Sequence, residues 1–244
     1  MKKSKQDDYY LKVEGNSFFQ RKNFKDKKVP ELRLTKQIIY DEIKQSNIKF
    51  NRVLEYGGNY GDLLNYLKKN ENIDEAICID ASNEALEFGR QNYGDSIKFS
   101  HGTIAHNQIN DDPDFQNFFD LIIIDDVFGW VSRETLFQSI SNIDNVLADG
   151  GFLFIRDFYP DKRIKNQNHH VQEGFVYNYK VPNSHASLFL TSGIYEIEWQ
   201  KVFFDDIGMS TNYKSNDRFI YRWTDIILKK SYSENFSEIK QTKT

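Results

Sequence analysis

Short apolar runs alternate with amphipathic segments through the middle of the chain. Each run is short and nearly continuous, which indicates a strand buried on both faces. The segments between the runs carry apolar residues at helical spacing, as Leu63, Leu64 and Leu67 do. The alternation predicts a doubly wound α/β fold, a mainly parallel sheet with helices on both faces. The predicted strands are 52–56, 76–80, 97–100, 121–125 and 152–156, and the predicted helices are 31–45, 62–69, 83–91 and 133–147.

The last third of the chain departs from this alternation. Residues 158–187 are polar, aromatic and loop-like, and we interpret them as an insertion on the substrate side of the fold. Two strand-like runs follow, 195–204 and 219–228, and they predict an antiparallel hairpin at one edge of the sheet. With this hairpin the predicted sheet has seven strands.

The two ends of the chain differ from the core in composition. Residues 1–30 are polar and aromatic-rich and lack a clear period, and we expect them to fold over the site as a lid. The tail, 231–244, is polar and is expected to fray. The predicted domain therefore spans 31–230, between an N-terminal extension and a C-terminal tail.

A glycine-rich turn follows the first predicted strand. Gly57, Gly58 and Gly61 lie between the end of that strand and the helix that begins at Asp62. Glycine lets a ligand approach the backbone closely, and the N–H groups of a helix N-terminus favour anionic groups. Strand, turn and helix together therefore predict a site for a nucleotide-type cofactor.

Two kinds of cofactor compete for this site. A dinucleotide fold expects Gly-x-Gly-x-x-Gly after the first strand, whereas residues 55–61 read Glu-Tyr-Gly-Gly-Asn-Tyr-Gly. Asp80, at the end of the second strand, is placed to accept hydrogen bonds from both hydroxyls of a ribose. A carboxylate in that place suits NAD and S-adenosylmethionine (SAM) alike. The turn thus weighs against a dinucleotide, and Asp80 leaves both cofactors open.

Further motifs follow the turn in order. Segment 119–127 runs from a buried strand into paired acids, and 146–153 passes from a helix through two glycines into the next strand. With the acid and the glycine turn, this order resembles the class I SAM-dependent methyltransferases, whose first motif is an acid followed by Gly-x-Gly-x-Gly. Asn59 takes the place of the middle glycine, and asparagine tolerates the positive φ of such a turn. The resemblance covers roughly residues 50–158, and it implies a Rossmann-like methyltransferase fold that binds SAM.

The resemblance implies a role for each matched position. The glycine turn would surround the methionine part of SAM, Asp80 would hold the ribose, and the two residues after it would flank the adenine. Residues after the third strand would lie near the adenine amine, although the acid that the family often has there is missing. The end of the fourth strand would form the floor near the sulfonium. The implied cofactor-binding residues are Glu55, Gly57, Gly58, Asn59, Gly61, Asp80, Ala81, Ser82, Gly102, Thr103, Asp125, Asp126 and Val127.

The methyl acceptor is expected near the insertion after the fifth strand. In an open α/β sheet the ligand binds beyond the carboxyl ends of the strands, so this insertion begins beside the site. A hydroxyl acceptor needs a base, and His169 or His170 is the preferred candidate because histidine titrates near working pH. Asp126 is the third candidate for a catalytic role. The predicted substrate-binding residues are Asp157, Tyr177, Lys180 and Arg21.

The charges of the insertion suggest a kind of acceptor. Lys180, together with Arg21 from the N-terminal segment, could hold an anionic group such as a phosphate or a carboxylate. Segment 157–180 loosely resembles bacterial methyltransferases of surface-glycan and nucleotide-sugar pathways, which implies a sugar-linked acceptor. An oxygen of a sugar, or of a nucleotide-linked or phosphorylated metabolite, is therefore the leading candidate.

Two subclasses of the family have signatures that the chain lacks. Metal-assisted O-methyltransferases have acids where Asp125 and Asp157 lie, and a divalent cation could bridge these two. The asparagine that accompanies the second acid is Phe158 here, so no metal is predicted. Enzymes that methylate amino groups of nucleic acids have an Asn/Asp-Pro-Pro-aromatic signature, and residues 125–128, Asp-Asp-Val-Phe, do not match it.

Composition narrows the partners and the compartment. The formal net charge is −4 and no basic stripe interleaves with aromatic residues, which weighs against a nucleic-acid polymer. Cys78 is the one cysteine, so no intrachain disulfide can form. The start lacks the apolar stretch of a signal peptide, and no apolar run is long enough to span a bilayer. We therefore expect a cytoplasmic protein without a membrane partner, and the oligomeric state stays open.

The sequence thus predicts a SAM-dependent methyltransferase with a small polar acceptor. An NAD-dependent oxidoreductase or epimerase is the first alternative, and the missing dinucleotide fingerprint argues against it. A non-catalytic SAM-binding protein is the second alternative, because Asn59 and the missing adenine-side acid both depart from the family pattern.

Overall fold

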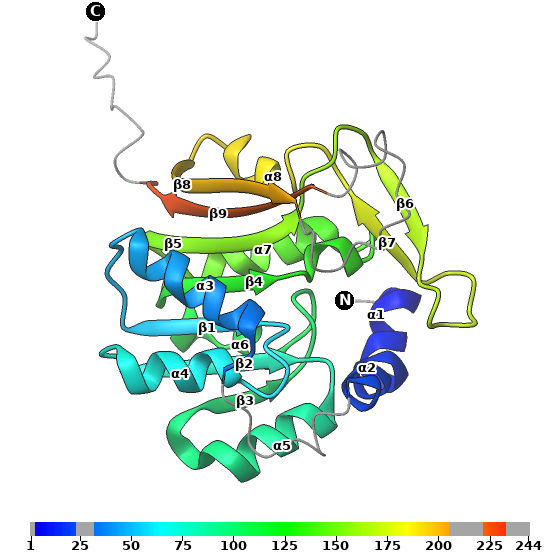
Figure 1. The fold of residues 1–244 in the computed structure, drawn as a ribbon, viewed down its shortest axis with the longest axis horizontal. Helices are drawn as coiled ribbons and strands as arrows, with labels where there is room; N and C mark the ends of the chain where they lie inside the picture. Colours follow the sequence, from blue (N-terminus) through cyan, green and yellow to red (C-terminus); the bar gives the residue numbers. More distant parts are fainter. Residues whose placement is uncertain (1–2, 23–31, 205–221, 233–244) are drawn as a thin grey trace, which may run out of the picture.

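The computed structural model describes residues 3–22, 32–204 and 222–232. Within these ranges the strands of the main sheet are β1 (Arg52–Tyr56), β2 (Glu75–Asp80), β3 (Lys98–His101), β4 (Phe119–Asp125), β5 (Leu147–Phe158), β8 (Tyr195–Phe204) and β9 (Arg222–Lys230). Their order is β3-β2-β1-β4-β5-β9-β8 (Figure 1). β1 to β5 run parallel, and β9 is antiparallel to both β5 and β8. The predicted α/β class, the mainly parallel seven-stranded sheet and the C-terminal hairpin are confirmed.

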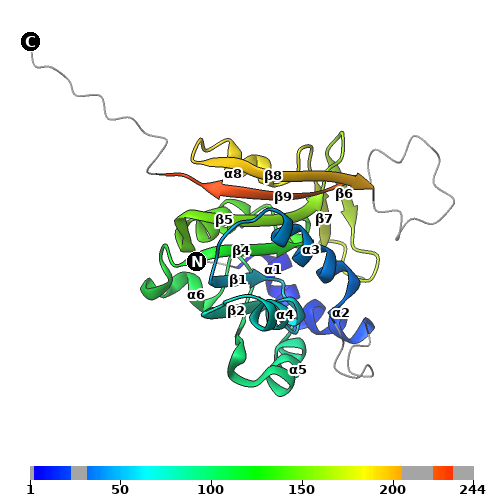
Figure 2. The same ribbon diagram turned by 60° about the vertical axis from the view of Figure 1, so that its left-hand side comes forward.

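Helices cover both faces of the sheet, as Figure 2 shows. In β4, Leu121 and Ile123 pack with the helices of one face, and Ile122 and Ile124 pack with those of the other. All four side chains are fully buried, as the continuous apolar run predicts. None of the helices in the described ranges combines the length and apolarity of a membrane span. The helices are α3 (Leu34–Gln45), α4 (Asp62–Asn70) and α5 (Asn83–Tyr93) on the first face, and α6 (Gln108–Asp111), α7 (Leu136–Val146) and α8 (Ala186–Leu190) on the second.

The direction of strand addition reverses between β1 and β4. The chain adds β2 and β3 on one side of β1, and β4 and β5 on the other side. Loops that leave the carboxyl ends of β1 and β4 therefore diverge, and open α/β sheets bind ligands in the crevice that this creates. The topology brings the glycine turn after β1 and the ends of β2 and β4 to one site.

Some predicted boundaries are wrong by a few residues. The helix predicted over 133–147 begins at Leu136, and Leu147 belongs to β5 because it pairs with Phe119. β5 is also longer than predicted, since it includes the turn at Gly150, where φ is +76°. Hydrophobic periodicity finds the element, but the hydrogen-bond partner of its last residue decides where the element ends.

The insertion over 158–187 is not the plain loop that the sequence suggests. It contains a second, antiparallel pair of strands, β6 (Ile164–Gln167) and β7 (Tyr177–Lys180). The buried residues of β7 are polar, Asn178 and Lys180, so no apolar alternation revealed the strand.

The described part of the N-terminal segment is helical, although its sequence shows no clear period. α1 (Lys5–Tyr9) continues through one π-helical turn, Tyr10–Glu14, into α2 (Gly15–Arg21). In Figure 1 these helices lie beyond the carboxyl ends of the strands, next to the β6–β7 pair. Parts of the sequence predictions lie outside the described residues, namely 1–2 and 23–31 of the extension and first helix, 219–221 of the last strand, and 233–244 of the tail.

Candidate active site

A cavity of about 830 Å³ lies at the carboxyl ends of the strands. The glycine turn and the ends of β2, β4 and β5 line one side of it, and the N-terminal helices and the turn between β6 and β7 line the other. Small-ligand sites occupy about 300–1,000 Å³, so the volume suits a cofactor together with a small second ligand. The predicted site residues that line this cavity are Gly57, Asn59, Asp80, Ala81, Gly102, Thr103, Asp125, Asp126, Val127, His169, His170 and Arg21.

The glycine turn has the backbone conformation that a close ligand requires. Gly57, Asn59 and Gly61 have φ values of +71°, +58° and +78°, so Asn59 adopts the left-handed conformation available to the glycine it replaces. A Cβ atom on Gly57 would lie 2.4 Å from Val127 Cγ2. The turn therefore packs directly against the end of β4, with its backbone facing the cavity.

Asp80 connects the two turns that border the cavity. Its Oδ2 accepts a hydrogen bond from the Asn59 N–H (2.8 Å), and its Oδ1 accepts one from the Ser82 N–H (2.7 Å). Burial raises the pKa of Asp80, and these two N–H groups oppose the shift. A carboxylate has more acceptor sites than these two bonds use, so Asp80 fits the hydroxyls of a ribose in the cavity.

We expect Asp80→Asn to weaken the binding of SAM and of S-adenosylhomocysteine (SAH) by about tenfold or more. Hydrogen bonds to a charged group contribute about 1.5–3 kcal/mol, and the amide removes the charge. Calorimetric titration measures both affinities. Asp74→Asn, at an exposed acid before β2, is the matched control. If Asp80→Asn binds SAH as tightly as the wild type does, Asp80 does not hold the ribose.

Lys36, which the sequence analysis did not single out, joins two of the predicted acids. Its Nζ lies 2.7 Å from Glu55 Oε1 and 3.0 Å from Asp125 Oδ2. Burial raises the pKa of Glu55 against the attraction of Lys36. At Asp125 burial also raises the pKa, but Lys36, Arg156 and Arg33 together outweigh it and the pKa is lowered. Lys36 stands at helical spacing from Ile39 and Ile43 on the buried face of α3, and a lysine on that face is the signal that could have revealed it.

Asp126 faces the cavity from the end of β4 with a φ of +54°. The side chain is exposed where it borders the cavity. Burial, and then the charges of Asp125 and Asp157, raise the pKa of Asp126 to about 8, while Lys180 and a hydrogen bond with the Trp130 side chain oppose the shift. A carboxylate that titrates near neutral pH in a cavity is suited to accept a proton.

The histidine pair lies in the turn between β6 and β7. The rings of His169 and His170 are 3.9 Å apart, and both side chains are exposed where they border the cavity. The His170 N–H donates to Asn168 Oδ1 (3.0 Å), and the Asn168 amide donates to Glu14 (3.4 Å). Slight burial and the charge of His169 lower the pKa of His170. The pair thus borders the N-terminal helices as well as the cavity.

Other predicted site residues lie behind the cavity lining. Asp157 is buried and pairs with the ring of His185, which the sequence analysis did not identify. Lys180 is buried with its Nζ 3.5 Å from the ring centre of Phe158, and burial lowers the pKa of Lys180 to about 8. Tyr177 binds Gln6 through its backbone. Glu55, Gly58, Gly61 and Ser82 also support the turns from behind, Gly58 by packing against Cys78 and Ser82 by capping α5.

Three or more histidine, cysteine, aspartate or glutamate side chains do not gather into a metal-binding group anywhere in the described part of the chain. Asp157 is bonded to His185, and Asp125 is bonded to Lys36. Both acids that were considered as metal ligands are therefore paired with side chains of the protein itself.

The sheet order, the reversed last strand and the glycine turn define the fold of a class I methyltransferase. A profile of the methyltransferase domain family matches residues 54–153, from β1 into β5. No curated protein gives a significant match to the chain. The family match over this part of the chain and the shared fold both agree with the methyltransferase domain that the sequence predicts.

Solved structures share the fold at low sequence identity. 1,6-Didemethyltoxoflavin-N1-methyltransferase from Burkholderia thailandensis, solved with 1,6-didemethyltoxoflavin and SAH, has a TM-score of 0.62 at 13% identity over 95% of this chain and 93% of its own. A putative methyltransferase from Haloferax volcanii, solved with the activator Trm112, has a TM-score of 0.59 at 15% identity over 91% and 100%. A putative sarcosine dimethylglycine methyltransferase from Galdieria sulphuraria has a TM-score of 0.58 at 13% identity over 81% and 85%.

Proposed function

We propose that the protein transfers a methyl group from SAM to a small molecule inside the cavity, with an oxygen as the expected acceptor atom. The observation that carries this proposal is that the glycine turn, Asp80 and Asp126 meet in one cavity. The turn and Asp80 are suited to an adenosine-containing cofactor. Asp126 lies past them at the end of β4, where a second ligand would meet the cofactor.

The side chains around Asp126 are arranged for proton removal and positioning. When bound, SAM supplies a methyl group on a positively charged sulfur. Asp126 accepts the proton of the acceptor, and the adjacent Trp130 side chain helps to position the carboxylate. The cavity walls hold the acceptor in line with the methyl group and exclude water, which supplies much of the rate in a displacement of this kind. His169 and His170 remain the alternative bases, at the exposed border of the cavity.

We expect kcat/KM to rise with pH and to level off above about pH 8. The ordinary pKa of an aspartate is 3.8 and that of Asp126 is raised to about 8, so the carboxyl is protonated below this pH and cannot accept a proton. The positive charge of bound SAM favours the ionised carboxylate. The profile of kcat should therefore inflect at a lower pH than the profile of kcat/KM for SAM, which reports the enzyme before SAM binds. Rates of SAH formation between about pH 6 and 9, with two different acceptors, measure both profiles. A flat kcat/KM profile would contradict the assignment of Asp126 as the base.

We also propose that the N-terminal helices act as a lid over the bound ligands. Gly15 packs so closely that a Cβ atom on it would lie 2.6 Å from the carbonyl carbon and oxygen of Ala81. Asn16 Oδ1 accepts hydrogen bonds from Ser82 Oγ (3.0 Å) and from the Glu84 N–H (3.1 Å). Gln6 bonds the other end of the lid to Trp130 (2.5 Å), on the acceptor side. The lid therefore connects the expected adenine side of the cavity with the expected acceptor side.

Gly15→Ala is expected to accelerate the release of SAH by roughly tenfold or more. Overpacking against backbone costs about 1–3 kcal/mol, and this cost falls only on the docked lid. Stopped-flow dissociation of SAH measures the rate. Gly174→Ala is the control, because the nearest atom to its added Cβ would be 3.9 Å away. Equal release rates in Gly15→Ala and in the wild type would show that the lid does not retain the cofactor.

The proposed activity is tested by an acceptor screen that follows SAH formation. The screen includes the sugar-linked and phosphorylated metabolites that the charged insertion suggests. It also includes heteroaromatic compounds, since the Burkholderia neighbour is an N1-methyltransferase of a heteroaromatic compound. SAM-dependent methylation of a compound in any of these groups supports the proposal. Tight SAM binding with no product from any group would favour the non-catalytic SAM-binding alternative.

A further inference from the structure

Aromatic side chains from three separate elements line the acceptor side of the cavity. Tyr10 comes from the π-helical turn of the lid, Trp130 from the short helix η5 (Phe128–Trp130), and Trp223 from the start of β9. The rings of Tyr10 and Trp130 are 6.4 Å apart, and the Trp130 side chain lies close enough to Asp126 to lower the pKa of its carboxyl. The proposed base is therefore bordered by aromatic rings of both the lid and the core. Rings of this kind favour a flat partner, because they interact with it face to face or edge to face.

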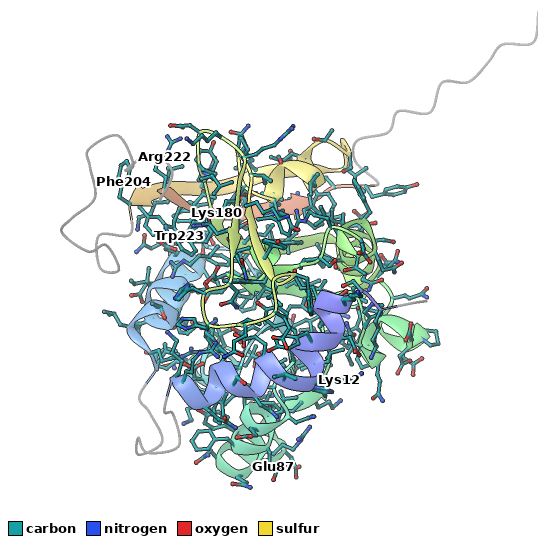
Figure 3. All side chains as sticks on the ribbon, turned by 90° about the vertical axis from the view of Figure 1, so that its right-hand side faces the viewer. Lys12, Glu87, Lys180, Phe204, Arg222 and Trp223 are labelled. Atoms are coloured by element: carbon teal, nitrogen blue, oxygen red, sulfur yellow. The ribbon has the colours of Figure 1, made fainter. Side chains whose placement is uncertain are left out.

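The strand register sets the distance across this side of the cavity. Trp223 pairs with Phe158 of β5, and Arg156 of β5 pairs with Asp125 of β4. Two strand spacings, roughly 10 Å across the sheet, therefore separate β9 from β4, and Trp223 lies two residues beyond the level of Asp125. One face of Trp223 packs on Phe158 with the ring centres 3.9 Å apart. Figure 3 shows Trp223 near Phe204 and Lys180, where β9, β8 and β7 come together.

Five of the six lysines and arginines among the described residues that line the cavity already have carboxylate partners. Arg21 lies 2.5 Å from Glu14, and its charge is thereby balanced where the cavity meets the lid. Lys22 lies at the border over the ring of Phe18. A phosphate group that bound one of these cations would draw it away from its carboxylate. A buried carboxylate would then be left without a neutralising charge, which is unfavourable. The other paired cations of the lining are Arg33 with Asp62, Lys36 with Glu55 and Asp125, Arg156 with Asp225 and Glu42, and Lys201 with Glu42.

From these contacts we infer that the acceptor is a planar aromatic or heteroaromatic compound. Its ionisable O–H or N–H faces Asp126, and its ring system lies against Tyr10, Trp130 and Trp223. This inference rests on the proposed methyl transfer and names its substrate class. The proton of the acceptor moves to the Asp126 carboxylate, and the electron pair left on oxygen or nitrogen forms the bond to the methyl carbon. The carbon–sulfur pair stays on sulfur, which becomes a neutral thioether.

Calorimetric titration of the SAH-saturated protein with four probes tests this class. Quercetin and lumazine are planar and carry ionisable O–H or N–H groups, whereas glucose 6-phosphate and glucose 1-phosphate carry the chemistry of a sugar phosphate. We expect at least one planar probe to bind about tenfold or more tighter than either sugar phosphate. Weaker binding of both planar probes than of a sugar phosphate overturns the inference, and so does binding of neither planar probe.

Variants of the lining separate stacking in the cavity from adventitious adhesion. Trp130→Leu, Trp223→Leu and Tyr10→Leu are each expected to weaken the binding of the better planar probe by about tenfold, since each removes an aromatic ring that contacts the probe. Phe137→Leu, at a side chain on α7 that is 74% exposed, is the control and is expected to change nothing. Probe affinity that is unchanged in all three lining variants overturns the inference.

The same titrations separate a failure of this inference from a failure of the proposed function. SAH binding in the wild type and in each variant is measured first, so a misfolded variant is recognised and replaced by one of the other two. If the protein binds SAH and then binds only the sugar phosphates, the proposal of methyl transfer is kept and the proposal of an aromatic acceptor is rejected. If the wild type does not bind SAH, the proposed function and this inference fall together.

Discussion

Asp126→Asn is expected to lower the rate of methyl transfer by about 10²- to 10⁴-fold, the contribution of a positioned general base. Asparagine preserves the shape of the side chain but cannot accept a proton. Asp126 lies past the predicted adenosine contacts, so the affinity for SAM should change by less than about tenfold. Single-turnover formation of SAH measures the rate, and calorimetric titration measures the affinity.

The histidine pair provides the comparison for this variant. His169→Ala and His170→Ala remove the other candidate bases without changing the end of β4. If Asp126 is the base, each histidine variant retains the rising limb of the pH profile and Asp126→Asn loses it. If a histidine variant loses the rising limb of the pH profile and Asp126→Asn keeps it, that histidine and not Asp126 is the general base.

Lys36→Met is expected to lower the free energy of unfolding by about 3–5 kcal/mol at pH 7. The substitution removes the cation that lies between Glu55 and Asp125, and two acids are then left close together in the core. Methionine has a similar length and is apolar, so loss of packing contributes little. Urea denaturation followed by circular dichroism measures the change.

A second lysine of α3 serves as the matched control. Lys44 pairs with Glu71 at 3.7 Å, but its side chain is 65% exposed, so Lys44→Met should cost less than about 1 kcal/mol. Glu55→Gln added to Lys36→Met should restore part of the loss, because it removes one of the two uncompensated charges. Equal costs for Lys36→Met and Lys44→Met would contradict the buried-cation account.

The fold could be predicted because its signals are local. Each signal comes from residues that are adjacent in the sequence. These signals are the continuous apolar strands, the amphipathic helices and the glycine pair that precedes the apolar part of β5. The cofactor side shares this property, since the glycine turn and Asp80 follow directly from the ends of β1 and β2. Asn59 in place of a glycine did not mislead the prediction, because asparagine adopts the same positive φ.

The acceptor side depends on contacts between distant segments. Asp157 is bonded to His185, and Gln6 reaches Trp130 and Tyr177 across more than half of the chain. The hydrophobic periodicity of a sequence does not indicate contacts between such distant residues. The β6–β7 pair escaped prediction for a different reason, since the buried side chains of β7 are polar and give no apolar alternation.

Pairing also determines which charged residues face a ligand. The sequence places Lys180 and Arg21 as anion-binding candidates, but Lys180 lies behind the lining against Phe158, and Arg21 is paired with Glu14. The sequence analysis gave Trp130 no role and assigned Tyr10 only to the aromatic lid segment, although both residues line the cavity with Asp126. The number of charged residues in a loop therefore predicts the acceptor less well than the ion pairs and contacts that these residues make in the folded protein.

Calorimetric titration of the wild-type protein with SAM, SAH and NAD tests the central claim most directly. The glycine turn with Asn59 at positive φ and the carboxylate of Asp80 are assigned to an adenosine cofactor of the methyltransferase type. The account predicts saturable binding of SAM and SAH with no measurable binding of NAD. Binding of NAD without binding of either SAM or SAH would contradict it.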